Sequence, residues 1–128
     1  MKAVDTNILA RALVRDDIAQ ARIADALIAE GIFIPLTVML ETAWLLGSRY
    51  KVGRDALSDI LSDIIDLPGV AVEQGDNVRW AVAQFRAGAD IADAIHILAA
   101  NGAEAFVTFD GEAFRKLIDP PVAIEVPR

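Results

Sequence analysis

Apolar residues along the chain fall into short unbroken runs separated by longer stretches with helical periodicity. The short runs predict strands at residues 2–5, 32–34, 70–72, 105–108 and 122–126. None of these runs alternates apolar with polar residues, as the strands of a half-exposed sheet do. The pattern therefore favours a parallel sheet that is covered on both faces.

The periodic stretches between these runs predict helices. One begins near Ile8, and the others are expected at residues 18–30, 37–46, 54–65, 77–87, 91–100 and 111–118. Asp17, Asp76 and Asp90 stand where N-caps are expected, and Gly31 stands where a helix should end. Strands that alternate with helices predict a three-layer α/β/α sandwich, with a mostly parallel central sheet of four to five short strands.

Length and composition indicate one globular domain over residues 1–128. The chain is 55% hydrophobic and contains only five prolines and eight glycines. It has no cysteine, which excludes disulfides and thiolate zinc sites. The first residues do not resemble a secretory signal, and charges interrupt every apolar run well before the ~18 residues of a membrane span. We therefore expect a soluble, cytoplasmic protein.

Five carboxylates stand where predicted strands and helices meet. Asp5 follows the first strand, Glu41 lies just inside a helix, Asp90 and Asp93 open another helix, and Asp110 follows the fourth strand. Open α/β sheets keep their active sites at such joins, so we expect one shared acidic pocket. Oxygen ligands without a His or Cys cluster favour Mg²⁺ or Mn²⁺. A site of this kind supports metal-assisted hydrolysis of a phosphodiester.

Most of these acids also have a structural interpretation, because Asp is strongly preferred at helix starts. Asp90 can cap a helix with Asp93 at the third helical position, and Asp110 can cap the next one. Glu41 is harder to explain in this way. If Thr37 is the N-cap, a capping box needs an acid three residues later, and that residue is Leu40.

The net charge of −7, from 19 acids and 12 bases, disfavours general binding of polyanions. A divalent metal would bridge carboxylates to a substrate phosphate. Arg49, Lys51 and Arg54 cluster between two predicted helices and are the best candidates for contacts with an RNA backbone; Arg11 and Arg15 are the second. The alternative for the cluster is an ordinary solvated loop.

The lone histidine and the tryptophans have less specific interpretations. His96 lies one turn beyond Asp93 on a largely apolar helix, where a core or supporting role is favoured over general-base catalysis. Trp44 and Trp80 are interpreted as core or interface residues, because no basic residues interleave with them as in a stacking platform.

The motifs, taken together and in order, resemble the PIN domain and, more narrowly, the VapC toxins of bacterial toxin–antitoxin pairs. They are Asp5-Thr6-Asn7, Glu41 in its helix, Asp90 with Asp93, and Thr108 with Asp110. The resemblance implies a metal-dependent endoribonuclease in which Asp5, Glu41, Asp90, Asp93 and Asp110 hold Mg²⁺ or Mn²⁺ and catalyse. In addition, Thr6, Asn7 and Thr108 would support the metal ligands without binding the metal themselves.

The same resemblance implies partners that composition and spacing do not reveal. These are a homodimer, a cognate VapB-type antitoxin that inhibits the enzyme in a larger toxin–antitoxin assembly, and a structured RNA such as tRNA.

Two other interpretations remain open from the sequence. An aspartyl-phosphate phosphatase needs an acid two residues after its nucleophile, but Asn7 stands two residues after Asp5. A receiver domain needs an acidic pair before the same Asp and a late Lys at a strand end, which this chain lacks. The other alternative is a PIN-like scaffold without turnover, and the complete set of acids argues against it.

Overall fold

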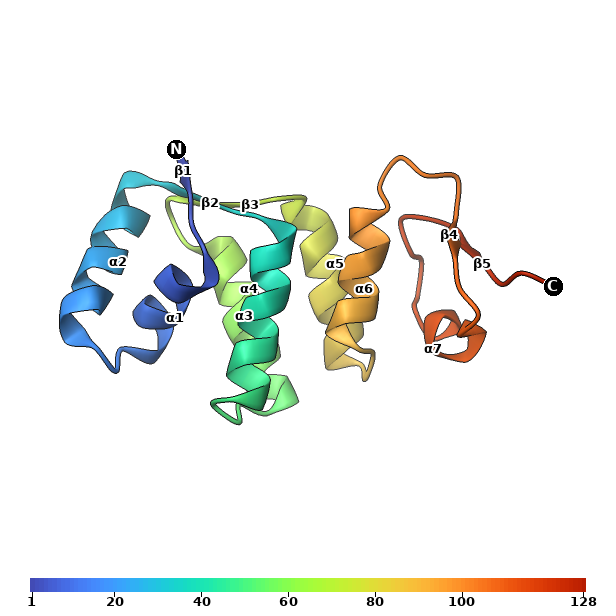
Figure 1. Ribbon diagram of the computed structural model, residues 1–128, viewed down its shortest axis with the longest axis horizontal. Helices are drawn as coiled ribbons and strands as arrows, with labels where there is room; N and C mark the ends of the chain where they lie inside the picture. Colours follow the sequence, from blue (N-terminus) through green and yellow to red (C-terminus); the bar gives the residue numbers. More distant parts are fainter.

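The computed structural model describes all residues from 1 to 128 as a row of helices beneath short strands (Figure 1). The elements are, in chain order, β1 (Lys2–Ala3), α1 (Thr6–Val14), α2 (Ile18–Glu30), β2 (Ile32–Ile34), α3 (Leu36–Ser48), α4 (Arg54–Asp66), β3 (Val70–Val72), α5 (Gly75–Arg86), α6 (Ile91–Ala99), β4 (Phe106–Val107), α7 (Gly111–Arg115) and β5 (Ile124–Glu125). The mixed α/β class predicted from the sequence is confirmed.

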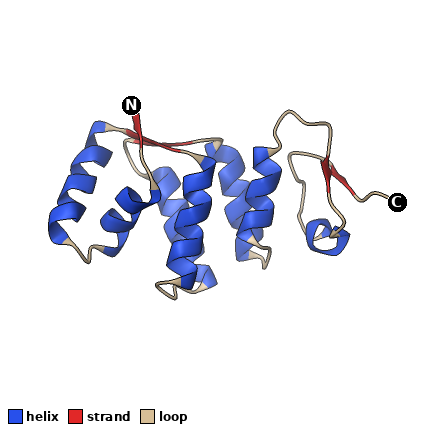
Figure 2. Ribbon diagram, in the orientation of Figure 1, coloured by secondary structure: helices blue, strands red, loops and turns tan.

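The strands are all parallel, as predicted, but they form two sheets. The first has the order β1-β2-β3, and the second pairs β4 with β5 alone. Figure 2 shows the two sheets well apart, with α5 and α6 between them. The expectation of one central sheet is therefore corrected: β1 is an edge strand, and the segment from β4 to β5 is a separate unit.

The hydrophobic core follows this division. A cluster of 18 buried residues packs around β2 and the helices α3 to α6, and it includes Ile32 and Ile34, which have no exposed surface. A smaller cluster joins α6 to the C-terminal unit through Ile97, Phe114 and Leu117. Trp80 packs against both clusters and so connects the two parts of the molecule.

Side-chain caps explain four of the seven helix starts, those of α1, α2, α6 and α7. Asp17 and Asp90 are N-caps, as predicted. The prediction that Asp76 caps α5 is wrong, because that helix begins at Gly75 and Asp76 lies in its first turn. Helix α3 likewise starts at Leu36, so Thr37 is not its N-cap.

One glycine controls the junction between β2 and β3. Gly69 has a φ of +83°, and a Cβ built on it would lie 2.5 Å from the carbonyl oxygen of Ile28. Its own carbonyl oxygen accepts a 2.7 Å hydrogen bond from the Ile32 amide. A side chain here would push the two segments apart.

None of the helices has the length and apolar character needed to cross a membrane.

Candidate active site

Three of the five candidate acids begin helices and cap them. Asp5 accepts a 3.2 Å hydrogen bond from the Ile8 amide at the start of α1. Asp90 accepts bonds from two amides of α6, at 2.7 and 3.2 Å. Asp110 accepts a 3.3 Å bond from the Ala113 amide of α7. Each bond uses a single carboxylate oxygen, Oδ1, so a cap does not occupy the whole side chain.

Asp93 and Glu41 differ from these caps, because neither caps a helix nor forms an ion pair. Burial raises the pKa of the Asp93 carboxyl, and the negative charges of Asp90 and Asp110 raise it further, while His96 partly opposes them. Asp93 therefore lies in a crowded negative field that extends from α6 to α7.

Glu41 and Asp5 border two different pockets. Glu41 lines a groove of about 530 Å³ between α1, α3 and α6. Asp5 lines a pocket of about 470 Å³ between α1 and α2. Asn7 is the residue common to both. The single acidic pocket expected from the sequence is therefore not seen: Asp5 and Glu41 border pockets on either side of Asn7, and neither pocket is lined by Asp90, Asp93 or Asp110.

The chemistry of the candidate carboxylates suits a hard cation, but their positions do not form a complete binding site. Asp90, Asp93 and Asp110 offer only oxygen ligands, which suit Mg²⁺ or Mn²⁺, and a cation would relieve the repulsion at Asp93. No three His, Asp or Glu side chains of the chain are arranged to hold one ion. A complete centre would require the acids to approach one another.

The three candidate supporting residues differ in environment. Thr6 is buried, with 5% of its surface exposed, and borders the Glu41 groove. Asn7 is exposed between the two pockets. The Thr108 hydroxyl accepts a 3.0 Å hydrogen bond from the Asp110 amide, which fixes the backbone that carries this acid.

Two of the candidate RNA-binding arginines are engaged by acids. Arg11 donates to Asp16 at 2.9 Å. Arg15 forms a bidentate pair with Asp25, with bonds of 3.0 and 2.9 Å. These bonds raise the pKa of Arg15 and lower that of Asp25. Both guanidinium groups already have a partner within the fold.

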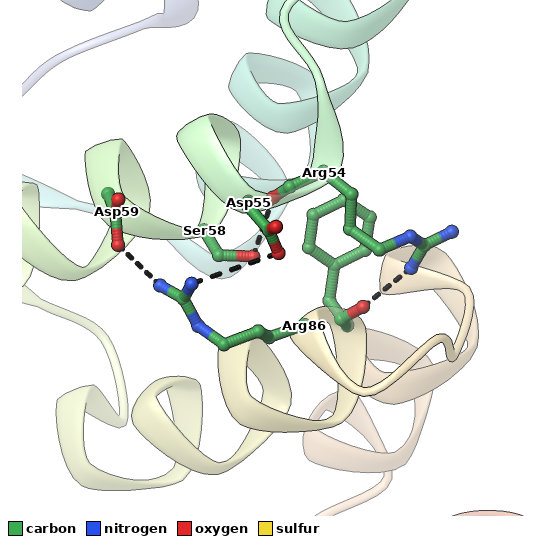
Figure 3. A network of polar contacts seen from close by, with 6 residues as sticks. Arg54, Asp55, Ser58, Asp59 and Arg86 are labelled. Atoms are coloured by element: carbon green, nitrogen blue, oxygen red, sulfur yellow. Dashed lines mark hydrogen bonds and ion pairs between the residues drawn. The ribbon is translucent and has the colours of Figure 1, made fainter.

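Arg54 joins α4 to the end of α5. Its guanidinium lies 4.5 Å from the centre of the Phe85 ring and donates to the carbonyl oxygens of Phe85 and Ala89, at 2.5 and 2.9 Å. Figure 3 shows this contact beside a second bridge, in which Arg86 reaches back to Asp59. Arg54 thus connects the two helices. This structural role explains the residue without any contact to RNA.

Arg49 and Lys51 are the basic candidates that remain free. Both are exposed, and neither takes part in an ion pair. Arg49 lines a small pocket that it shares with Asn7, Arg11 and Tyr50. Asp16 also lines this pocket but pairs with Arg11, so the Arg49 guanidinium stays unpaired beside Asn7.

Two aromatic side chains near the acids lie outside the core. His96 is exposed, which excludes the core role and leaves the supporting role, and its charge opposes the rise in the pKa of Asp93. Trp44 is 65% exposed and lines the same groove as Glu41. The spacing of Glu41 and Trp44, three residues apart on one helix, was the available signal that both point the same way.

Comparison with known proteins agrees with the fold. No curated protein sequence matches the chain significantly. The family model described as the PIN domain matches residues 2–119, which is nearly the whole chain. PIN domains generally are Mg²⁺-dependent nucleases that bind divalent metal ions. The chain belongs to the PIN domain family.

Proposed function

We propose that this protein is a metal-dependent endoribonuclease, and that it acts as a VapC-type toxin. The observation that carries the proposal is the family match over residues 2–119, within which all five candidate acids fall. The field of Asp90 and Asp110 around Asp93 adds independent support. Repulsion among carboxylates is costly unless a cation or proton neutralises it.

Asp90, Asp93 and Asp110 would hold Mg²⁺ or Mn²⁺, and Asp5 and Glu41 are the further candidate ligands. The bound ion would supply an activated water and neutralise charge on the substrate phosphate. Asp90 and Asp110 keep one oxygen in their helix caps, so the backbone fixes where the other oxygen lies. Thr108 holds the turn before Asp110.

Nuclease activity is tested directly by incubating purified protein with a panel of total RNA, tRNA and single-stranded oligonucleotides. We expect cleavage with Mg²⁺ or Mn²⁺ and none in EDTA, because metal-free carboxylates repel the phosphate. Cleavage that persists in EDTA would contradict the mechanism. Metal binding without cleavage of any RNA would favour a PIN-like scaffold without turnover.

The toxin role adds a homodimer and an inhibitor to this proposal. A VapB-type antitoxin would present an Arg or Lys from its C-terminal segment to Asp5, Glu41 and Asp93, since guanidinium pairs well with carboxylates. Induced expression would then arrest growth, and co-expression of the antitoxin would restore it. Unimpaired growth with active nuclease present would remove the toxin role and leave the nuclease.

A further inference from the structure

Trp44 presents a large apolar surface to solvent beside the candidate active site. Its side chain is 65% exposed on α3, one turn after Glu41. Trp80, by contrast, is half-buried, and its ring nitrogen donates to the Ile118 carbonyl oxygen. The exposed ring offers a large, flat apolar surface, and covering it with another flat apolar group would be favourable.

The groove at Trp44 combines an aromatic surface with polar groups. Half of its eight lining residues are hydrophobic, and the others include Thr37 and Asn7. Its volume of about 530 Å³ falls within the range of small-molecule sites. A nucleobase needs this combination: a flat apolar surface for its ring, and hydroxyl and amide groups for its edge.

Charged groups border the groove. Glu41 lines it, and so does Ala92, which stands between Asp90 and Asp93 in the sequence. Asn7 and Leu45 are shared with the pocket that contains Arg49. A nucleotide in the groove would therefore lie against one candidate metal ligand, Glu41, and next to the pocket that holds the Arg49 guanidinium.

We propose that Trp44 stacks against an unpaired nucleobase next to the scissile phosphate. The substrate segment is then single-stranded RNA, since a paired base has both faces covered by its neighbours. Arg49 contacts the adjoining phosphate. This inference rests on the proposed nuclease function and adds to it the base-binding residue.

The test measures RNA binding with Ca²⁺ in place of Mg²⁺, because Ca²⁺ takes oxygen ligands and neutralises the carboxylates but does not keep the strict octahedral geometry of Mg²⁺. A gel run after each titration checks that the probe is still intact. Fluorescein-labelled 12-nucleotide poly(A) RNA is titrated with wild type, Trp44→Phe and Trp44→Leu, and a 12-base-pair RNA duplex serves as the comparison probe. We expect Trp44→Leu to weaken poly(A) binding about tenfold, Trp44→Phe to retain most of it, and neither to change duplex binding. Ile118→Ala is the matched control, because Ile118 is 66% exposed and does not line the groove, and this variant should bind as wild type does.

Tryptophan fluorescence supplies a second readout. In a Trp80→Phe protein the emission comes from Trp44 alone, and poly(A) is expected to quench it. Unchanged binding by Trp44→Leu would overturn the inference while leaving a cleaving wild type as a nuclease. A change in oligomeric state, with unchanged RNA binding, would instead assign the groove to self-association. Absence of both binding and cleavage in wild type would overturn the proposed function as well.

Discussion

The capping acids and the non-capping acids of the candidate site are held in different ways. Asp5, Asp90 and Asp110 each accept a backbone hydrogen bond at a helix start. Asp93 and Glu41 lie within helices and cap nothing. The first group thus has a structural use that does not depend on any ligand, whereas the second group has none in the fold.

This difference separates two roles that a sequence cannot distinguish. Asn caps a helix about as well as Asp does, so Asp→Asn removes charge and keeps the cap, while Asp→Ala removes both. For a non-capping acid the two substitutions should affect stability alike. A comparison of the Asn and Ala variants of one acid can therefore separate its contribution to stability from its contribution to catalysis.

The largest effect is expected on RNA cleavage by Asp93→Asn and Asp5→Asn. Each removes a candidate metal ligand, and loss of several kcal/mol of charge stabilisation corresponds to about a hundredfold lower rate or more. Because Asn keeps the Asp5 cap and relieves repulsion at Asp93, the metal-free melting temperature should not fall. Cleavage assays with Mn²⁺ and thermal melts in EDTA measure both. Variants that melt far below wild type would show that the acids are structural.

The basic residues allow the same comparison between free and engaged side chains. Arg49→Ala with Lys51→Ala should weaken RNA binding about tenfold and reduce the salt dependence by about one unit of slope per lost phosphate contact. Arg15→Ala, whose guanidinium pairs with Asp25, is the matched control and should leave binding nearly unchanged. Titrations at several salt concentrations test this prediction. Equal losses in the two proteins would move the RNA contact away from the Arg49 loop.

A smaller effect is expected on stability when the α6 cap is removed. Asp90→Ala should lower the free energy of unfolding by about 1 kcal/mol relative to Asp90→Asn, since only the former loses the bonds to the helix amides. Glu41→Ala and Glu41→Gln should be equally stable. Urea unfolding without metal gives the four values. No difference between the two Asp90 variants would mean that water replaces the cap.

The smallest effects concern pH, and their signs are opposite. The folded-state pKa of Asp93 is raised, so its carboxylate costs stability as pH rises past the ordinary value of 3.8. As pH rises past 3.8, Asp93→Asn should become more stable relative to wild type. The pKa of Asp25 is lowered by Arg15, so this pair stabilises the fold above 3.8 and loses its effect in stronger acid. Asp25→Asn should be slightly less stable than wild type at neutral pH, and this difference should shrink as pH falls below 3.8, as melts from pH 2 to 7 without metal would show.

The sequence predicts elements well where the signal is local. Asp17 and Gly31 bound α2 as expected, because a capping oxygen and a glycine act within a few residues. The start of α3 could not be found in this way. The Leu36 amide is satisfied by the carboxylate of Glu73, 37 residues later, at 3.0 Å. The division into two sheets is equally non-local, since nothing in the sequence of β4 indicates which strand will pair with it.

The candidate site shows the same limit. The order and spacing of the acids predicted which residues to examine, but not that Asp5 and Glu41 would border separate pockets. Among the bases, Arg54 looked identical to Arg49 in the sequence. Only the position of Phe85 on a distant helix shows that Arg54 is used within the fold.

The separate C-terminal sheet has a consequence for how the molecule opens. The strands β4 and β5 pair only with each other, through bonds such as Phe106 to Ala123 and Thr108 to Glu125. A unit of this size can unfold locally while the three-stranded sheet stays intact, and its amides should exchange with solvent sooner than that of Ile32. Asp93 and Asp110 then belong to different cooperative units. An ion bound by a ligand from each unit would couple the opening of the two units, because opening either one would lose the binding free energy of the ion.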